Sequence, residues 1–517
     1  MAQRYFAQTA VLLNGLDNVA VLKARVNAGD ELVNGAARVS VAEEIGPGHK
    51  IAVTDIADGA PVLKYGQVIG FAKDHIPAGA HVHTHNLVLK DFGRDYQFCA
   101  NARPVSYYPP EQMRYFQGYA RAGGRLGTRN YLAVISSVNC SASVSCYVRD
   151  RFRHEEFQRN FPNVDGVVAF THKAGCVTDL GESLPMLQRV LAGMARHPNI
   201  SGYVMIGLGC ELNQVEAIRR AYQLDDLRPG EAAPAFMNIQ ALGGVRKTVE
   251  AGVAALAQLL PAANALRRTA QPLSKLVLAE NCGGSDGNSG ITANPALGVA
   301  SDELVRYGGT SVLAETPEVY GAEHLLTRRA VSREVGEQLL ERIRWWGKYS
   351  RLHGCSMDNN PSCGNKEGGL SNIIEKSLGA VAKGGQSPLT AVHQYAEPVL
   401  GPGLCFMDTP GYDPVSMTGL VAGGCNIGVF TTGRGSVYGC KPMPCIKVAA
   451  HTPLYQRMEE DMDINAGTIL DGTETVAEVG RRIFEKIIAV ASGEKTKSEL
   501  AGLGDEEFAP WQPGPTF

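Results

Sequence analysis

The chain has 517 residues, which is more than one hydrophobic core usually supports, so two or three domains are expected. Its formal net charge of -3 argues against a dedicated nucleic-acid or membrane surface and favours a small-molecule partner. No apolar run reaches the roughly 18 residues that span a bilayer, and the start, MAQRYFAQTAVLLNG, lacks a secretory signal pattern, so a cytoplasmic location is expected.

The first part of the chain contains short apolar runs separated by Gly and Pro. These runs are AVLLN, NVAVLKA, IAVTDI, PVLKYG and VIGFA. Their alternation and the lack of helical periodicity predict a small all-β domain over residues 8–98. The segment 99–117 holds several prolines and no consistent period, which predicts a linker.

From residue 118 the pattern changes to nearly continuous apolar runs, which are typical of strands covered on both faces in a parallel sheet. The runs are YLAVISSV, VDGVVAFT, GYVMIGLG, KLVLAE and TSVLAE, followed later by GLCFMDT, NIGVFTT and CIKVAA. Amphipathic helical segments such as LPMLQRVLAGMARH and RKTVEAGVAALAQLL alternate with them. The sequence therefore predicts two α/β domains with mostly parallel sheets, over 118–270 and 271–517.

Three of the 12 cysteines directly follow predicted buried strands, namely Cys176, Cys210 and Cys282. Ligands of α/β sheets collect beyond the carboxyl ends of the strands, so these thiols are candidates to converge on iron or zinc. Three ligands would leave one coordination position for a substrate. A buried thiol can equally be a small apolar core residue, and the spacing leaves open both a mononuclear metal and an iron–sulfur cluster.

A second candidate cluster is the segment HVHTHN, with His81, His83 and His85. In an extended segment these side chains point to one side, which suits metal binding or proton transfer. A solvated edge strand explains the pattern as well. The pair His49 and Lys50 in GPGHKIAVTDI is a weaker signal, because a basic pair after a turn usually lies on the surface.

Four glycine-rich loops form a third group: GGRLGTRN, CGGSDGNSGITANP, NPSCGNKEGG and TTGRGSVYG. None matches a Walker A loop or a dinucleotide fingerprint in its structural context, so no nucleotide cofactor is expected. Their backbone N–H groups and cationic neighbours suit carboxylates and hydroxyls, although glycine turns beside a solvated cation are common. The candidate substrate-binding residues are Arg129, Asn130, Ser285, Asp286, Asn365, Lys366 and Arg434.

The motifs GYARAGGRLGTRNYLAV, MIGLGCE, CGGSDGNSGITANP, NPSCGNKEGGL and FTTGRGSVYG resemble the altronate and galactarate dehydratase family over essentially the whole chain. The front part, with GHKIAVTDI and YGQVIG, resembles the β-clip SAF module of that family. The resemblance implies a SAF module followed by two α/β domains. It also implies dehydration of an aldonic or aldaric acid to a 2-keto-3-deoxy acid with Fe²⁺, or with Mn²⁺. The three cysteines fall on recurring family positions.

The resemblance leaves the sugar acid open. HVHTHN and CGGSDGNSGITANP look like the altronate branch, whereas LLTRRAV, MDINAGTI and the region around EVGRRIFEKI look like the galactarate branch. The segment HKAGC departs from both, because those branches usually carry Tyr where Ala174 stands.

Dehydration must remove a proton beside a carboxylate and expel hydroxide from the neighbouring carbon. One hypothesis gives the metal to the three cysteines and the role of base to His83 or His85. The alternative gives the metal to His81 and His83, with His49 or Lys50 as base. A sulfo-lyase acting on a sulfonated hydroxy acid such as sulfolactate, or a non-catalytic sugar-acid-binding protein, are the alternative functions. A homodimer is expected, because it is the commonest soluble oligomer.

Overall fold

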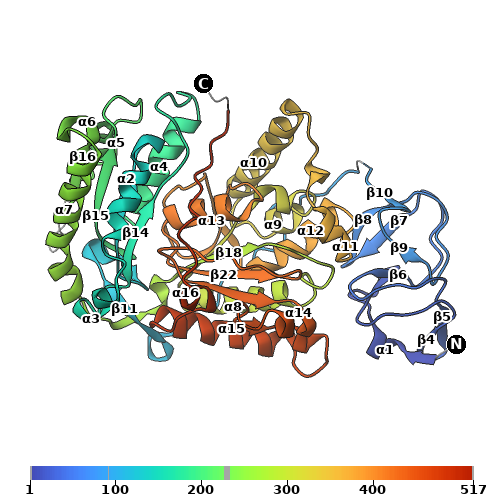
Figure 1. The fold of residues 1–517 in the computed structure, drawn as a ribbon. Helices are drawn as coiled ribbons and strands as arrows, with labels where there is room; N and C mark the ends of the chain where they lie inside the picture. The colour runs from blue at the N-terminus through green and yellow to red at the C-terminus, as the bar shows by residue number, and fades with distance from the viewer. Residues whose placement is uncertain (1–2, 91, 226–232, 515–517) are drawn as a thin grey trace.

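A computed structural model describes residues 3–90, 92–225 and 233–514. An N-terminal β domain and a first α/β domain lie on opposite sides of a larger C-terminal α/β domain (Figure 1). This arrangement confirms the predicted fold class. Within the described residues, no helix is long and apolar enough to cross a membrane.

The N-terminal domain is built from short strands, because its apolar runs are interrupted by turns every few residues. It contains β1 (Gln3–Tyr5), α1 (Phe6–Thr9), β2 (Ala10–Val11), β3 (Val19–Leu22), β4 (Glu31–Asn34), β5 (Ala37–Ser40), β6 (Lys50–Ala52), β7 (Pro61–Lys64), β8 (Gln67–Ala72), β9 (His81–Val82) and β10 (Leu87–Val88). They form three small sheets, in the orders β1-β4-β5, β2-β3-β6-β9 and β10-β8-β7. The antiparallel pairing of β6 with β9 sets Ile51 opposite His81.

Part of the predicted linker is ordered as a sheet. After η1 (Pro110–Gln112), β11 (Tyr115–Ala120) pairs antiparallel with β12 (Leu126–Gly127) and with β17 (Thr269–Pro272). The last residues of the segment 99–117 are therefore strand rather than linker. This pairing joins the beginning and the end of the first α/β domain.

The first α/β domain has a four-stranded parallel sheet in the order β14-β13-β15-β16. Every residue of β13 is buried, as expected for a strand covered on both faces. The elements are β13 (Tyr131–Ser136), α2 (Asn139–Asp150), α3 (Glu155–Asn160), β14 (Gly166–Phe170), α4 (Ser183–Ala195), β15 (Ile200–Gly207), α5 (Val215–Ala221), β16 (Ala235–Asn238), α6 (Ile239–Leu242) and α7 (Val245–Ala265).

The C-terminal domain has a seven-stranded parallel sheet in the order β20-β21-β19-β18-β22-β23-β24. Its strands are β18 (Val277–Cys282), β19 (Thr310–Leu313), β20 (Leu389–His393), β21 (Gly403–Met407), β22 (Ile427–Thr432), β23 (Cys445–Ala449) and β24 (Ile464–Asn465). Its main helices are α8 (Ala293–Arg306), α9 (His324–Thr327), α10 (Arg333–Leu352), α11 (Cys363–Glu367), α12 (Ile373–Ala380), α13 (Asp413–Ala422), α14 (Thr452–Arg457), α15 (Val476–Ala491) and α16 (Lys497–Leu500). Short 3₁₀ turns include η3 (Leu273–Lys275), η4 (Thr316–Val319) and η6 (Val381–Gly384).

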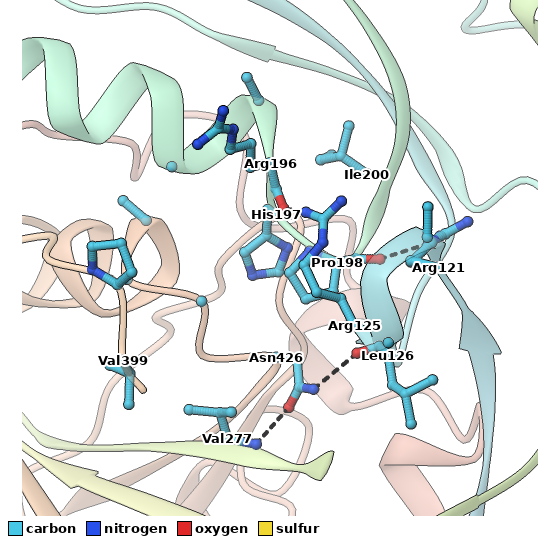
Figure 2. A pocket seen from close by; sticks show the side chains of 18 of the residues that line it. Arg121, Arg125, Leu126, Arg196, His197, Pro198, Ile200, Val277, Val399 and Asn426 are labelled. Atoms are coloured by element: carbon cyan, nitrogen blue, oxygen red, sulfur yellow. Dashed lines mark hydrogen bonds between the residues drawn. The ribbon is translucent and has the colours of Figure 1, made fainter. Parts of the chain in front are cut away.

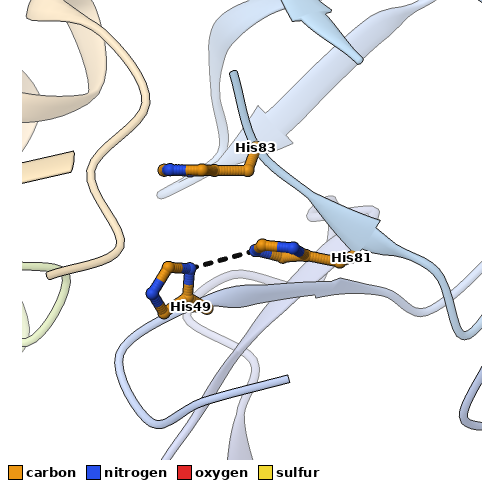
Figure 3. Close-up of side chains that lie close together, drawn as sticks. All are labelled: His49, His81 and His83. Carbon is orange, nitrogen blue, oxygen red and sulfur yellow. Dashed lines mark hydrogen bonds between the residues drawn. The ribbon is translucent and has the colours of Figure 1, made fainter. Parts of the chain in front are cut away.

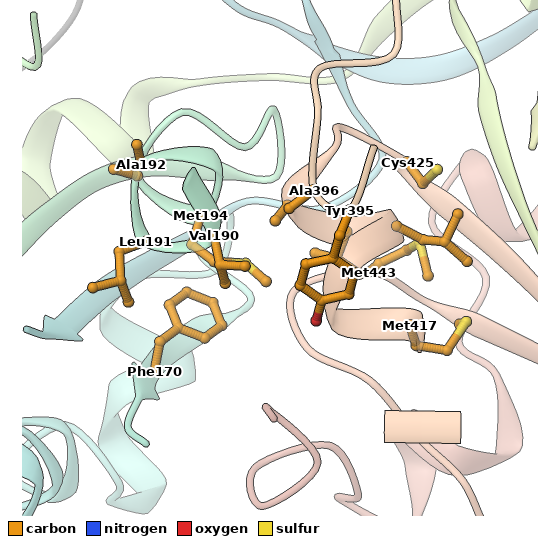
Figure 4. Packing of buried hydrophobic residues seen from close by; sticks show 14 of the residues in the cluster. Phe170, Val190, Leu191, Ala192, Met194, Tyr395, Ala396, Met417, Cys425 and Met443 are labelled. Atoms are coloured by element: carbon orange, nitrogen blue, oxygen red, sulfur yellow. The ribbon is translucent and has the colours of Figure 1, made fainter. Parts of the chain in front are cut away.

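The two α/β domains share one hydrophobic core. Figure 4 shows Phe170, Val190 and Met194 of the first domain facing Tyr395 and Met443 of the C-terminal domain. At the contact of α4 with α13, a Cβ on Gly193 would lie 2.2 Å from the carbonyl oxygen of Ala422, so glycine permits this close approach. The shared core fixes the relative position of the two parallel sheets.

Candidate functional site

Three imidazoles of the N-terminal domain meet at its contact with the C-terminal domain (Figure 3). The Nδ1 atom of His49 lies 3.0 Å from Nε2 of His81, and the ring of His83 stacks on that of His81 with centroids 5.3 Å apart. One nitrogen from each of the three rings lies within 4.8 Å of the others. Such a set of nitrogen donors can hold a divalent transition metal.

The histidine segment is not fully extended, contrary to the prediction. Strand β9 ends at Val82, and the Asn86 side chain accepts from the His83 amide at 3.0 Å and donates to the His81 carbonyl at 2.9 Å. This asparagine-stabilised turn folds the chain back. The exposed ring of His85 still lies close, with its centroid 5.4 Å from that of His81. A turn therefore gathers the imidazoles that a strand was expected to align.

The C-terminal domain contacts two of these rings. His49 Nε2 lies 3.1 Å from the Glu367 carbonyl oxygen, and His83 Nδ1 lies 3.3 Å from the Ser371 hydroxyl. Burial, with smaller effects of neighbouring positive groups, lowers the pKa of His81 to about 3 and of His83 to about 4. Both rings are therefore neutral near pH 7, which is the form that ligates metal.

Lys50 lies beside this cluster but faces away from solvent. Its fully buried ammonium donates to the Gly369 carbonyl at 2.7 Å and to Glu375 at 2.9 Å, while Lys64 donates to the other Glu375 oxygen at 2.8 Å. Although burial raises it, the two lysine charges lower the pKa of Glu375 to about 2. The prediction of Lys50 as a base in contact with substrate is wrong, because its amine is enclosed in an interdomain ion pair.

Backbone contacts between glycines bring the N-terminal domain against the glycine-rich loops. A Cβ on Gly287 would lie 2.0 Å from the Gly48 carbonyl oxygen, and a Cβ on Gly369 would lie 2.2 Å from the same atom. The Gly287 amide also donates to the Gly368 carbonyl at 2.8 Å. The loop that carries His49 is therefore held between the loops CGGSDGNSGITANP and NPSCGNKEGG, and only glycine permits this approach.

A second, buried cluster surrounds Cys282 at the end of β18. Its sulfur lies 2.8 Å from Lys383 Nζ and 3.4 Å from Glu318, and Lys383 pairs with Glu315 at 3.2 Å. Lys376 on α12 pairs with Glu318 at 2.6 Å. Lys383 and Lys376 each pair with one of the two glutamates, and the sulfur and carboxyl oxygen atoms of the cluster are also close enough together to hold a metal ion.

The acidic residues of the second cluster differ in their pKa values. Burial and Glu318 raise the pKa of Glu315, whereas Lys376, opposing burial, holds the pKa of Glu318 below its usual range. The partly exposed Asp413 has its pKa raised to about 6 by burial and by Glu318. Carboxyl groups whose pKa values are separated in this way can take the roles of acid and base in one site.

Sequence reasoning missed Glu315, Glu318, Lys376 and Lys383. A signal existed for the two glutamates, because TSVLAETPE places them directly after a predicted strand, as for Cys282. The two lysines carried no such signal, because α12 and η6 reach the site only through tertiary packing.

The three predicted metal-binding cysteines are not brought together. Cys176 and Cys210 are exposed and belong to the first α/β domain, where Cys210 Sγ accepts from Gln240 at 3.3 Å. Cys282 lies at the end of a strand in the other sheet. Among the described residues, the three sulfurs are not a group with all ligand atoms within 4.8 Å of one another. This arrangement contradicts a single three-cysteine centre, because the strand ends lie in two different sheets.

Two predicted substrate-binding residues prove to be structural. Arg129 is completely buried and donates from Nε and Nη2 to Glu499 at 2.6 and 2.8 Å. Asn130 is also buried and donates to the carbonyl groups of Asn163 and Ala263. The prediction is wrong for both, because their polar groups are used in anchoring α15 and α16 and in closing the first α/β domain.

The remaining predicted residues surround the glycine-rich loops. Asp286 accepts from the amides of Asn288 and Ser289 and so stabilises its own loop. Asn365 accepts from the amide of Ser362, the N-cap residue of α11, and donates to the Ser285 carbonyl of the neighbouring loop at 2.8 Å. Ser285 is buried, and its hydroxyl has no hydrogen-bond partner among the described residues.

Arg434 and Lys366 are the accessible cations beside Glu367, whose carbonyl contacts His49. The side chain of Arg434 is 46% exposed and lies 3.4 Å from the Glu367 carboxylate, and Lys366 is partly exposed. These two remain candidates for binding a substrate carboxylate.

The fold and the site define an enzyme with a candidate metal centre where a small β domain meets a parallel α/β domain. Residues 8–90 match the altronate/galactarate dehydratase SAF domain, residues 118–264 the D-galactarate dehydratase/altronate hydrolase second domain, and residues 273–516 the D-galactarate/altronate dehydratase C-terminal domain. The chain belongs to the galactarate and altronate dehydratase family, and it is a hydro-lyase.

Three relatives illustrate the range of the family. The galactarate dehydratase (L-threo-forming) of Escherichia coli is 38% identical over 98% of this chain and 97% of its own. The altronate dehydratase of the same organism is 36% identical over 95% of this chain and 96% of its own. The (2R)-sulfolactate sulfo-lyase subunit beta of Chromohalobacter salexigens is 30% identical over 76% of this chain and 96% of its own.

Proposed function

We propose that this enzyme dehydrates a sugar acid, an aldonate or an aldarate, to its 2-keto-3-deoxy acid where the SAF domain meets the C-terminal domain. The observation that carries the proposal is the convergence of His49, His81 and His83 beside the glycine-rich loops. The similarity to altronate and galactarate dehydratases over nearly the whole chain supports the substrate class.

His49, His81 and His83 would hold the metal, Fe²⁺ or Mn²⁺, since their neutral nitrogens lie close enough together for one ion. The set contains no thiolate, so it fits a mononuclear ion rather than an iron–sulfur cluster. When bound, such an ion supplies Lewis-acid stabilisation of the negative charge that develops on the substrate carboxylate. The contacts of His49 with Glu367 and of His83 with Ser371 orient the rings.

Arg434 and Lys366 would bind the substrate carboxylate. Arg434 is paired only weakly with Glu367, at 3.4 Å and in an exposed position, so a substrate carboxylate can replace Glu367 at the guanidinium. The substrate would then lie beside the histidine cluster, with its reacting carbons near the exposed His85.

His85 is the proposed base that takes the C2 proton, because it is exposed and adjoins the cluster without belonging to its close triad. Asp413 is the proposed acid that protonates the leaving hydroxyl. Its side chain is partly exposed, and its pKa is raised to about 6. Its carboxylate lies against the glycine-rich loop CGGSDGNSGITANP, because a Cβ built on Gly283 would lie 2.2 Å from a carboxylate oxygen. Loss of water leaves an enol, which becomes the keto acid without further catalysis.

The test is an anaerobic assay of the iron-loaded protein against aldonic and aldaric acids, with semicarbazide detection of 2-keto-3-deoxy products. We expect turnover that a chelator abolishes. His81→Ala should lose both bound iron and turnover, whereas His85→Ala should retain iron and lose turnover. Full iron content in His81→Ala would contradict the metal assignment, and unchanged turnover in His85→Ala would contradict the base.

Elimination of sulfite from a sulfonated hydroxy acid is a second candidate, favoured by the 30% identity with a sulfolactate sulfo-lyase subunit. Both reactions remove a proton beside a carboxylate and expel a group from the neighbouring carbon. Sulfite release from sulfolactate, with no product from any sugar acid, would favour this second reaction.

A further inference from the structure

Three exposed cysteines lie at one edge of the parallel sheet in the first α/β domain. Cys140 is in the first turn of α2, which follows β13, while Cys176 follows β14 and Cys210 follows β15. All three therefore stand beyond the carboxyl ends of adjacent strands. In Figure 1 this edge of the sheet is marked by α6, which directly follows β16.

The strand order of this sheet reverses between β13 and β15. The chain passes from β13 to β14 on one side and from β15 to β16 on the other. At such a switch point the loops diverge, and ligands of open α/β sheets bind there. Cys140 and Cys210 follow the two strands that flank the switch point. They therefore occupy the position where the topology predicts a ligand.

The loops that carry the three cysteines are bonded to one another. The amide of Asn139, next to Cys140, donates to the Ala174 carbonyl at 2.8 Å. The Leu212 amide donates to the carbonyl of Cys176 itself at 2.9 Å. Since Leu212 lies two residues after the third cysteine, each loop contacts its neighbour within two residues of a thiol.

Buried polar side chains hold these loops in place. Glu211 accepts from the Ser137 hydroxyl at 2.8 Å and from the Gly209 amide at 2.6 Å. The ring of His172, also buried, accepts from the Ala174 amide at 3.2 Å. The thiols themselves are exposed, although the side chains that fix their loops are not. This is the arrangement of a preformed binding site rather than of a packed core.

The surroundings of the thiols suit a negatively charged ligand that is shielded from water. The side chains of Val177, Leu180 and Leu212 are 53%, 71% and 44% exposed on the same loops. Apolar side chains beside a metal centre restrict the access of solvent to it. Cys140 lies in the first turn of the 12-residue helix α2, where the unpaired backbone amides favour negative charge.

The opposite edge of this sheet has a different role. Figure 2 shows it at the cleft between the two α/β domains, which is lined by Ile200, the first residue of β15. His197 lies there with its Nε2 atom 2.9 Å from the Cys425 carbonyl oxygen of the C-terminal domain. The three exposed cysteines do not line this cleft. The amino-terminal edge of the sheet thus contacts the C-terminal domain, whereas the carboxyl edge carries the exposed thiols.

We propose that Cys140, Cys176 and Cys210 bind an iron–sulfur cluster at this carboxyl edge. Thiolates are the protein ligands that select such clusters. Among the described residues, the three sulfurs are not a group within 4.8 Å of one another, so their spacing does not suit a single ion. In a cluster the cysteines bind different iron atoms, and a wider spacing fits.

The cluster site is separate from the proposed active site. The cysteines belong to the first α/β domain, whereas the three histidines lie where the SAF domain meets the C-terminal domain. A four-iron cluster has four positions for cysteine, so three cysteines leave one iron open to water or to a carboxylate. The protein would then hold iron in two forms, a mononuclear ion at the histidines and a cluster at the thiols.

The experiment is anaerobic reconstitution of the full-length protein with ferrous iron and sulfide. After removal of unbound metal, the visible absorbance, the iron and the acid-labile sulfide are measured. We expect iron and sulfide in equal amounts beyond the one iron of the histidine site. Cys140→Ser, Cys176→Ser and Cys210→Ser should each lose most of the sulfide and of the absorbance. Cys355→Ser is the matched control, because Cys355 is an exposed cysteine of the C-terminal domain.

The three replaced cysteines are exposed, so folding should be unaffected, which urea denaturation checks. His81→Ala should lose the mononuclear iron and keep the sulfide, which distinguishes the two centres. Absence of labile sulfide in the wild-type protein, or unchanged sulfide in the three variants, would overturn the proposal. An equal loss in Cys355→Ser would show iron sulfide bound without a specific site. One zinc ion bound by the three thiols, with no sulfide, would overturn the cluster assignment.

Discussion

Lys50 of the SAF domain and Glu375 of α12 form an ion pair with 2.9 Å between nitrogen and oxygen, and both side chains are completely buried. The next residue of the helix, Lys376, pairs with Glu318 in the cluster beside Cys282. Consecutive residues of α12 thus connect the docking of the SAF domain with the buried acids of the C-terminal domain. A change at either residue should affect both regions.

Replacing Glu375 by Gln should strongly destabilise the protein. The change leaves the buried ammonium groups of Lys50 and Lys64 without their shared partner, and breaking such a pair costs about 3–5 kcal/mol of unfolding free energy. Urea denaturation measures the loss. Glu250→Gln is the control, because Glu250 forms an exposed pair on α7 and should cost nothing measurable. A loss equally small for both variants would show that the buried pair is not important for stability.

Gly287→Ala should displace the loop that carries His49, because the new Cβ would lie 2.0 Å from the Gly48 carbonyl oxygen. We expect weaker iron retention and a loss of kcat/KM of about tenfold or more, since small displacements of a catalytic site are costly. Gly364→Ala is the matched control, because a Cβ at Gly364 would meet nothing within 4 Å. Normal iron content and activity in Gly287→Ala would contradict the close docking of the loops.

Arg434→Gln should raise KM about 10- to 100-fold for a sugar acid, because a charge-assisted bond to a carboxylate contributes about 1.5–3 kcal/mol. Steady-state kinetics with the best substrate of the panel measure the effect. Arg457→Gln is the control, since Arg457 donates to the Arg434 carbonyl from an exposed position and has no proposed contact with substrate. An unchanged KM in Arg434→Gln would remove Arg434 from the substrate site.

Arg129→Met should unfold more easily and yet bind substrate normally. Its removal leaves the largely buried Glu499 without a partner, and we expect a loss of about 3–5 kcal/mol in unfolding free energy. KM, measured at a temperature where the variant is folded, should stay within twofold of the wild-type value. A large rise in KM without loss of stability would restore Arg129 as a substrate-binding residue.

Stability should fall as the pH decreases below about 6.5, in part through His172. Burial lowers the pKa of His172 to about 4 in the folded protein, so the unfolded chain binds the proton first and is favoured as the pH falls from 6.5 toward 4. Urea titrations at pH 7.0, 5.5 and 4.5 should show a shallower decline in His172→Gln. His154→Gln is the control, because His154 is exposed, and it should follow the wild-type protein. Parallel declines for His172→Gln and the wild-type protein would contradict the shift.

Local sequence patterns predicted the architecture because a strand that is buried on both faces consists of a continuous run of apolar residues. The run YLAVISSV predicted β13, and the same reasoning placed Cys282 at a strand end that the structure confirms. The same reasoning predicted an extended segment through His83, whereas β9 ends at Val82. The Asn86 side chain forms hydrogen bonds with the local backbone there, in competition with the sheet.

The sequence by itself determined the β domain and the two α/β domains, their main strands and the family. These follow from short-range periodicity and from motifs that are contiguous in the chain. Only the tertiary structure decided that His49 joins His81, that Lys50 and Arg129 are buried in ion pairs, and that Cys282 is separated from Cys176 and Cys210. The physical reason is distance along the chain. Lys50 and Glu375 are 325 residues apart, and their contact depends on how whole domains pack, which no local pattern specifies.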